Sequence, residues 1–149
     1  MASPPHPLPA AMGRTENALR ALLMRTLTGT PVHSYEEWVT LNLIDSRAGG
    51  VDDDAEALRG VLAVDRASAR FLLDDLVARG LLLKHDERNH VLSRDGSDLL
   101  AGLRSAVAGT SRRLLDGLAL DDLAVTVRTL DRIRARADHE LANTPGGHG

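Results

Sequence analysis

The stretch AVDRASARFLLDDLVARG, residues 63–80, decides how the rest of the chain is interpreted. Asp65 can cap a helix, and Gly80 is a natural terminator for one. Arg66 and Arg70 are four residues apart with small residues between them, so they lie about 40° apart around a helix axis. The expected buried face has helical spacing and consists of Ala69, Leu72, Leu73 and Leu76.

Three helices are expected before this one. The first spans residues 15–27, where leucines recur on one face. Ser34 and Glu37 form a capping box, which predicts a second helix over 35–46. The acidic run Asp52-Asp53-Asp54 favours a third helix start, because negative charge stabilises a helix N-terminus, and this helix ends near residue 62.

The helical spacing of apolar residues ends at residue 80. Two short apolar runs, 81–85 and 90–93, flank the turn-rich residues 86–89 and predict a small β-hairpin. Long amphipathic helices are expected over 95–116 and 121–141. The predicted fold is therefore mainly α with a small β-hairpin, which must lean on helices because two strands alone are marginally stable.

Two helices joined by a tight turn and followed by a hairpin describe a winged helix-turn-helix. In that motif the second helix enters the major groove of DNA, where arginine forks can bridge guanine or contact phosphate. The alternative is that these arginines are ordinary solvated charges, with Arg70 paired to Asp74. The candidate DNA-binding residues are Asp65, Arg66, Ala67, Ser68, Arg70, Lys84, Asp86 and Arg88.

These segments together resemble the MarR family of dimeric winged-helix transcription regulators, over residues 16–141. LRGVLAVDRASARFLLDDLVARGLL (58–82) resembles that family's turn and recognition helix, and SYEEWVTL (34–41) resembles its second helix. Residues 93–100 resemble the segment from wing to long helix, and LDGLALDDL (115–123) resembles the junction of the last two helices. The order of these segments along the chain is more specific to the family than any one of the segments.

The chain departs from the family pattern at the helix corner and in the wing. Ala63 and Asp65 stand where the family usually has glycine and serine, so an anion lies near the groove. The wing is two residues shorter, which shortens its reach by roughly 3 Å. By resemblance Arg88 enters the minor groove, with Asp86 orienting its guanidinium. The alternative in the shorter wing is that this contact falls back to phosphate or is lost.

Phe71 is an unusual residue on the outward row of the predicted recognition helix. Its ring could touch a thymine methyl group. The preferred interpretation is that it packs under the wing as core.

The opening residues MASPPHPLPAAM hold four of the six prolines, which predicts a disordered leader over 1–14, and NTPGGHG predicts a flexible tail over 143–149. The resemblance implies helical dimerisation segments over 15–31 and 95–142, a DNA-binding lobe over 32–94 and a homodimer. The paired subunits would place two recognition helices about 34 Å apart on a pseudo-palindromic duplex. The alternative is a monomer with a helical cap.

Related regulators often bind small organic ligands between their dimer helices and DNA-binding lobe. Trp38 could stack on a ring and His33 could meet an anion, with Tyr35 beside them. The preferred alternative is that Trp38 is core and His33 a loop residue.

Composition excludes several classes of protein. The chain has no cysteine, so disulfides, thiol nucleophiles and thiolate metal sites are excluded. Its six histidines are scattered, and His85 and His90, which could face each other across the hairpin, would not by themselves form a structural metal site. No phosphate-binding loop or nucleophile motif suggests an enzyme, and no cofactor is expected. No apolar run is long enough for a membrane span, and a cytoplasmic location is the simplest expectation.

The net charge of −3 argues against a non-specific coat for nucleic acid. Its acidic excess lies in residues 1–64, with five arginines against eight acids. The sequence therefore predicts a sequence-specific DNA-binding regulator, a repressor released by a small organic ligand. The rival is a winged-helix module for a ligand or protein that has lost operator binding.

Overall fold

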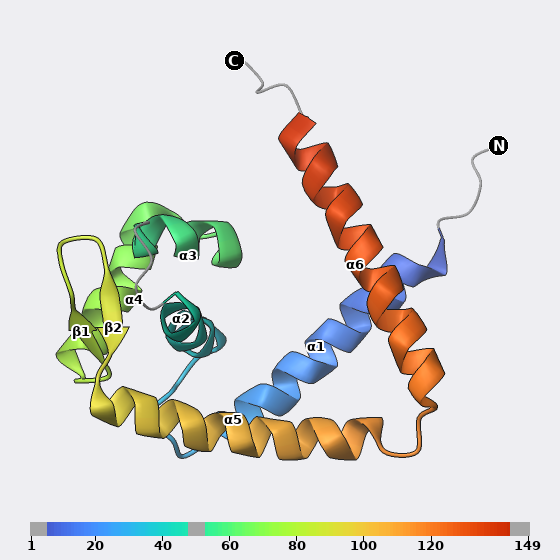
Figure 1. Ribbon diagram of the computed structural model, residues 1–149, viewed down its shortest axis with the longest axis horizontal. Helices are drawn as coiled ribbons and strands as arrows, with labels where there is room; N and C mark the ends of the chain where they lie inside the picture. The colour runs from blue at the N-terminus through green and yellow to red at the C-terminus, as the bar shows by residue number, and fades with distance from the viewer. Residues whose placement is uncertain (1–5, 48–52, 144–149) are drawn as a thin grey trace. The chain divides into compact units, whose positions relative to one another are not determined.

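The computed structural model describes residues 6–47 and 53–143, and the chain divides into two units, residues 1–110 and 111–149. The described residues form six helices and one two-stranded sheet, so the predicted mainly α fold with a small hairpin is confirmed (Figure 1). The expected tail beyond residue 143, the first five residues of the expected leader, and Asp52 lie outside the described residues.

Helix α1 (Pro7–Leu27) begins well before the predicted residue 15. The ring of His6 caps it by accepting a hydrogen bond from the Leu8 amide at 3.2 Å. Pro7 and Pro9 fall in its first turn, where amide groups have no helical acceptor and proline is tolerated. The expected disordered leader is therefore wrong for residues 7–14, which are helical.

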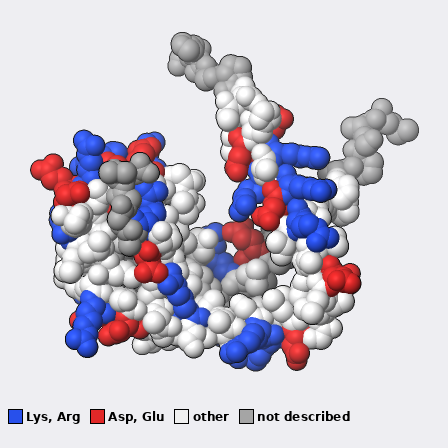
Figure 2. Space-filling view, viewed as in Figure 1, with Lys and Arg blue, Asp and Glu red and all other residues white. Residues whose placement is uncertain are grey.

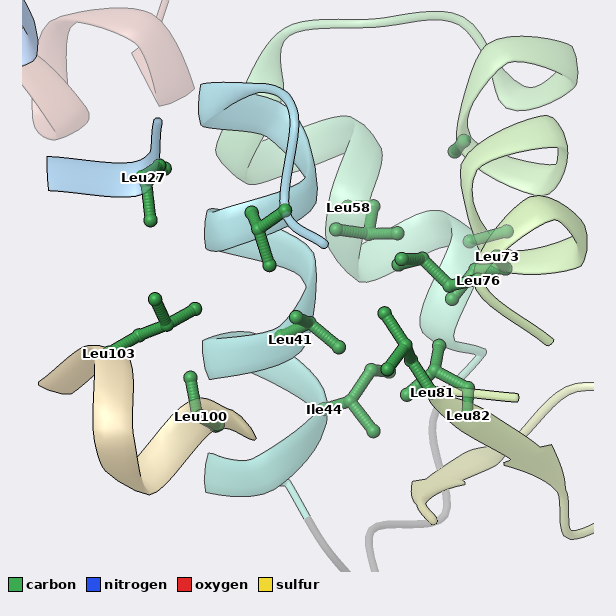
Figure 3. Packing of buried hydrophobic residues seen from close by; sticks show 13 residues of the cluster. Leu27, Leu41, Ile44, Leu58, Leu73, Leu76, Leu81, Leu82, Leu100 and Leu103 are labelled. Carbon is green, nitrogen blue, oxygen red and sulfur yellow. The ribbon is translucent and has the colours of Figure 1, made fainter. Parts of the chain in front are cut away.

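Helix α2 (Tyr35–Ser46) matches its prediction. The Ser34 Oγ accepts from the Glu37 amide at 3.1 Å, and the Glu37 carboxylate accepts from the His33 amide at 2.8 Å. Leu41 and Ile44 are buried, and they place α2 at the centre of the apolar cluster shown in Figure 3. The capping box thus fixes the helix start, and the apolar stripe fixes its buried face.

Helices α3 (Asp54–Leu62) and α4 (Arg66–Ala78) form the predicted helix-turn-helix. The turn between them contains Ala63, whose backbone is left-handed with φ 53°. The Asp65 carboxylate caps α4 by accepting from the Ser68 amide at 2.7 Å. This corner is tight because Ala63 takes a conformation that favours glycine, and the αL form costs an alanine roughly 1–2 kcal/mol.

The wing consists of β1 (Leu82–Lys84) and β2 (His90–Leu92), paired antiparallel. Lys84 lies opposite His90, so the expected pairing of His85 with His90 is wrong. His90 is buried instead, and the Asp54 carboxylate accepts from its amide at 2.6 Å. The Asp54 amide donates to the Arg88 carbonyl at 3.1 Å, so the start of α3 anchors the wing.

Helix α5 (Arg94–Leu115) follows the wing, and α6 (Leu120–Asn143) ends the described chain. Leu100 and Leu103 of α5 are buried in the apolar cluster (Figure 3). None of the residues of α6 is buried within the single chain. In the second unit the exposed large apolar side chains are Leu114, Leu115, Leu118, Leu120, Val125, Val127, Leu130 and Leu141.

Among the described residues, every helix is too short or too polar to cross a membrane.

Candidate nucleic-acid interface

The outward face of α4 is the candidate interface, because it lies opposite the helix side that enters the core. Ala69, Leu73 and Leu76 are buried, and Ala67 and Phe71 are exposed. A helix turns about 100° per residue, which places Ala67 and Phe71 near the middle of the outward face. The exposed candidates on α4 and at its N-cap are Asp65, Arg66, Ala67, Ser68 and Arg70.

Arg66 is exposed, but its guanidinium is held within the chain. It donates to the Asp53 carboxylate at the start of α3, and to the Glu56 carboxylate at 3.3 Å. Its side chain is 43% exposed, so the pairs remain in contact with solvent. The side chain therefore lies against α3, and a DNA contact by Arg66 must compete with two carboxylates.

The Asp53 carboxylate also carries a pH-dependent contribution to stability. Burial opposes its ionisation, but the hydrogen bond from Arg66 and those from the amides of Glu56 and Ala55 hold the Asp53 pKa below its usual value. Because the folded-state pKa is the lower one, the stabilisation is complete above the unfolded pKa of about 3.9. It is lost as the pH falls towards the folded value.

We expect Asp53→Asn to flatten the acid limb of the stability curve below about pH 4. The amide retains the oxygen that accepts from the Ala55 amide at 3.0 Å, so the helix cap survives. Urea unfolding at a series of pH values measures the effect. Arg66→Met should flatten the same limb, and equal slopes in all three proteins would contradict this assignment.

Arg70 and Arg88 face the hollow between α4 and the wing. This hollow holds about 270 Å³, and its basic lining residues are Arg70, Lys84 and Arg88. Within the described residues, neither Arg70 nor Arg88 has an ion-pair partner, so the alternative pairing of Arg70 with Asp74 does not form. Asp74 pairs instead with the Lys84 ammonium at 3.2 Å. Arg70 and Arg88 thus remain available to an anionic partner.

Asp86 does not orient the Arg88 guanidinium as the resemblance implied. Its carboxylate accepts from the amides of Arg88 and Asn89, at 2.7 and 2.8 Å, and from the Asn89 side chain. The hydrogen bond from the Asn89 side chain, followed by that from the Arg88 amide, lowers the Asp86 pKa. Asp86 therefore closes the wing turn and leaves the Arg88 side chain free.

Phe71 does not pack under the wing, so its interpretation as core is wrong. Its side chain is 73% exposed. It borders an open groove of about 550 Å³ that is lined mainly by apolar groups. The lining residues are Ser34, Glu36, Val64, Ala67, Ser68, Phe71 and Leu72.

The three candidate ligand-binding residues have different local surroundings. His33 is exposed and lines a small cavity of about 130 Å³ that includes neither of the other two. The Arg20 guanidinium lies 4.2 Å from the centroid of the Tyr35 ring, a cation–π contact. Trp38 is half-buried against the apolar cluster. A ligand role for these side chains stays a prediction.

Basic and acidic side chains intermingle on the visible face of the winged lobe (Figure 2). In the same lobe the ion pairs of Arg66 with Asp53 and of Lys84 with Asp74 put acidic side chains beside basic ones. Asp53 and Glu56 were missed as partners of Arg66, because the turn between α3 and α4 joins residues far apart in sequence. The described residues on the visible face of the lobe therefore carry no continuous basic patch.

Known structures share this arrangement of helices and wing. A MarR family protein from Bacillus stearothermophilus superposes with a TM-score of 0.72 at 16% identity, over 88% of this chain and 93% of that chain. The fold is that of the MarR family. The transcriptional regulator PA3341 is 25% identical with a TM-score of 0.69, over 89% of this chain and 98% of that one. No family model and no curated protein matches the sequence.

A third MarR-like neighbour is BpsR of Bordetella bronchiseptica, with a TM-score of 0.67 and 20% identity over 89% of this chain and 98% of that chain. The DNA binding of that protein is regulated by 6-hydroxynicotinic acid. In the MarR-like fold α3 and α4 are the helix-turn-helix, and β1 and β2 are the wing. The sequence prediction of this fold is confirmed.

Proposed function

We propose that this chain is a sequence-specific DNA-binding transcription regulator that acts as a homodimer. The observation that carries the proposal is Arg70, an exposed cation without an ion-pair partner among the described residues, on the outward face of α4. Arg88 is a second such cation on the adjoining wing. Recognition helices present their N-terminal residues to base edges, and a wing flanks the same site.

The apolar surface of the second unit supports a homodimer. Leu120 is 82% exposed and Leu141 is 76% exposed at the two ends of α6. Exposed large apolar residues also lie between them, at Val125, Val127 and Leu130. Monomeric proteins rarely leave so long an apolar surface uncovered, and a second copy of the same helix covers it symmetrically.

Release by a small organic ligand is the regulatory part of the proposal. Its support is the MarR-like fold shared with BpsR, whose DNA binding responds to an aromatic acid. His33, Tyr35 and Trp38 are the side chains that we assign to this response. A repressor that loses its operator when the ligand binds is the simplest form of such regulation.

A second candidate is a winged-helix module that has lost operator binding. The observation in its favour is that Arg66 and Lys84 are paired with Asp53, Glu56 and Asp74 inside the chain. These pairs reduce the positive charge available to phosphates. The two candidates differ in whether specific, salt-sensitive DNA binding exists.

The test selects duplexes from a randomised pool with the full chain and measures their affinity by fluorescence anisotropy at several salt concentrations. Wild type should bind a selected duplex at least a thousandfold more tightly than random DNA. Arg70→Ala should weaken this binding about tenfold per half-site. Arg66→Ala should weaken it less, because wild-type Arg66 must first leave its two carboxylates, and this cost offsets the benefit of its contact with DNA.

Arg104→Ala is the matched control, since Arg104 pairs with Asp45 at 2.6 Å on another surface. Its affinity for the selected duplex should equal that of wild type. Equal binding to selected and random DNA, or no binding, would favour the second candidate.

A further inference from the structure

Phe71 lies at the centre of the outward face of α4, whereas the basic residues of this helix lie to the side. The core side of the helix is defined by Ala69, Leu73 and Leu76. At about 100° per residue, Ala67 and Phe71 point away from that side, while Arg66 lies close to its edge. The side chain at the centre of the outward face is therefore a benzyl ring.

The surroundings of the ring are apolar and open. Ala67, one turn before Phe71, is too small to cover it, and Val64 and Leu72 complete an apolar strip along the groove of about 550 Å³. The basic side chains stand apart from this strip: Arg66 is bound to Asp53 and Glu56, and Arg70 lines the hollow beside the wing. Ser34, Glu36 and Ser68 also line the groove, so the apolar groups form a strip within it.

The major groove offers such a surface one apolar group, the 5-methyl of thymine. We propose that Phe71, with Ala67 beside it, reads a thymine methyl in each half-site and is a specificity-determining residue. The inference rests on the proposed function. It commits to DNA as the occupant of the groove, because Arg70 on the flank of the same helix can pair with phosphate while the ring meets the base edge.

The alternative occupant is an apolar residue of a second copy of the chain. The exposed polar side chains around the ring argue against it, since Ser68 lines the groove and Arg70 flanks it. The long apolar surface suited to a second copy lies in the second unit, on α6. The oligomeric state of a Phe71 variant distinguishes the two occupants.

The experiment compares thymine with uracil, which lacks the methyl group and keeps every hydrogen-bonding group. The probe is the duplex selected by the wild-type chain, synthesised with uracil in place of thymine at one symmetry-related pair of positions at a time. At one such pair, wild type should lose about fourfold in affinity per half-site, the value of one buried methyl. Phe71→Ala should bind the thymine and uracil duplexes equally, and Phe71→Leu should retain part of the difference.

Leu83→Ala is the control, because Leu83 is a 53% exposed apolar side chain on the wing. Its ratio of thymine to uracil affinity should match that of wild type. A wild type indifferent to every methyl, an unchanged ratio in Phe71→Ala, or a changed assembly mass of Phe71→Ala would each overturn the inference alone. Failure to select any duplex would overturn the proposed function, and this inference with it.

Discussion

Replacing Gly96 with alanine is expected to lower the free energy of unfolding by about 3 kcal/mol, which is a large fraction of the stability of a small domain. Gly96 is buried in the first turn of α5, against the backbone of Leu81. A Cβ atom there would lie 2.0 Å from the Leu81 carbonyl oxygen and 3.0 Å from its carbonyl carbon. Backbone atoms cannot rotate away as a flexible side chain can, so the helix and the strand entry must separate.

Hydrogen bonds tie the same two segments together. The Ser93 Oγ donates to the Gly80 carbonyl at 2.6 Å and accepts from the Gly96 amide at 2.9 Å. The Ser93 amide donates to the Leu81 carbonyl at 3.1 Å. Any shift that relieves the clash strains these bonds, which hold the end of α4, the wing and α5 in register.

Gly102→Ala is the matched control, because Gly102 lies in the same helix and a Cβ atom there would meet nothing within 4 Å. Alanine is favoured over glycine in a helix by about 1 kcal/mol, so Gly102→Ala should raise the free energy of unfolding. Urea denaturation of both variants measures the two effects. Stability changes of the same sign and size would show that the close approach to Leu81 is unimportant.

Local signals in the sequence predicted α2 with its observed bounds. Ser34 and Glu37 mark its start, and Leu41 and Ile44 give its buried face, so no distant residue is needed. The sequence does not predict the start of α1, because prolines clustered near a terminus favour disorder. In the first turn of a helix the missing amide of Pro7 costs little, because that amide would have no helical acceptor. The position of the prolines in the helix therefore matters more than their number.

The sequence predicts which face of α4 is exposed, but it does not predict which side chains pair with the residues on that face. Asp65 caps α4 as expected, since a cap is a contact between near neighbours. The carboxylate that reaches Arg66 from Asp53 depends on the angle between two helices, which sequence spacing does not define. Phe71 was misassigned because aromatic residues usually bury, although the stripe of Ala69 and Leu73 already placed it outward.

Arg79→Met should lower the free energy of unfolding by about 2 kcal/mol, because it leaves a buried carboxylate without its counter-ion. Glu37 is 8% exposed, and its two carboxylate oxygens accept from Arg79 at 2.8 and 3.2 Å. Arg79 also donates to Asp75 at 2.7 Å and to the Pro31 carbonyl. Hydrogen bonding to Glu37 and then to Asp75 outweighs desolvation and raises the Arg79 pKa, so the guanidinium stays charged.

A double-mutant cycle separates this pair from general effects of either substitution. Glu37→Gln keeps an oxygen that can accept from the His33 amide, which the Glu37 carboxylate now does at 2.8 Å. The doubly substituted chain should lose less stability than the two single losses together, by about 1.5 kcal/mol, because neither change then leaves an unpaired charge. Additive losses would show that the pair of Glu37 and Arg79 does not account for the effect of Arg79→Met.

The surface pair of Arg104 and Asp45 is the internal comparison for Arg79. Their side chains are 45% and 39% exposed, and their 2.6 Å contact is as short as any around Glu37. Exposed pairs contribute about 0–1 kcal/mol, so Arg104→Met should fall well below the effect of Arg79→Met. Since the contact distances are similar and burial differs, a larger loss at Arg79 than at Arg104 attributes the effect to the partly buried network of Arg79 and Glu37, which joins the end of α4 to the start of α2.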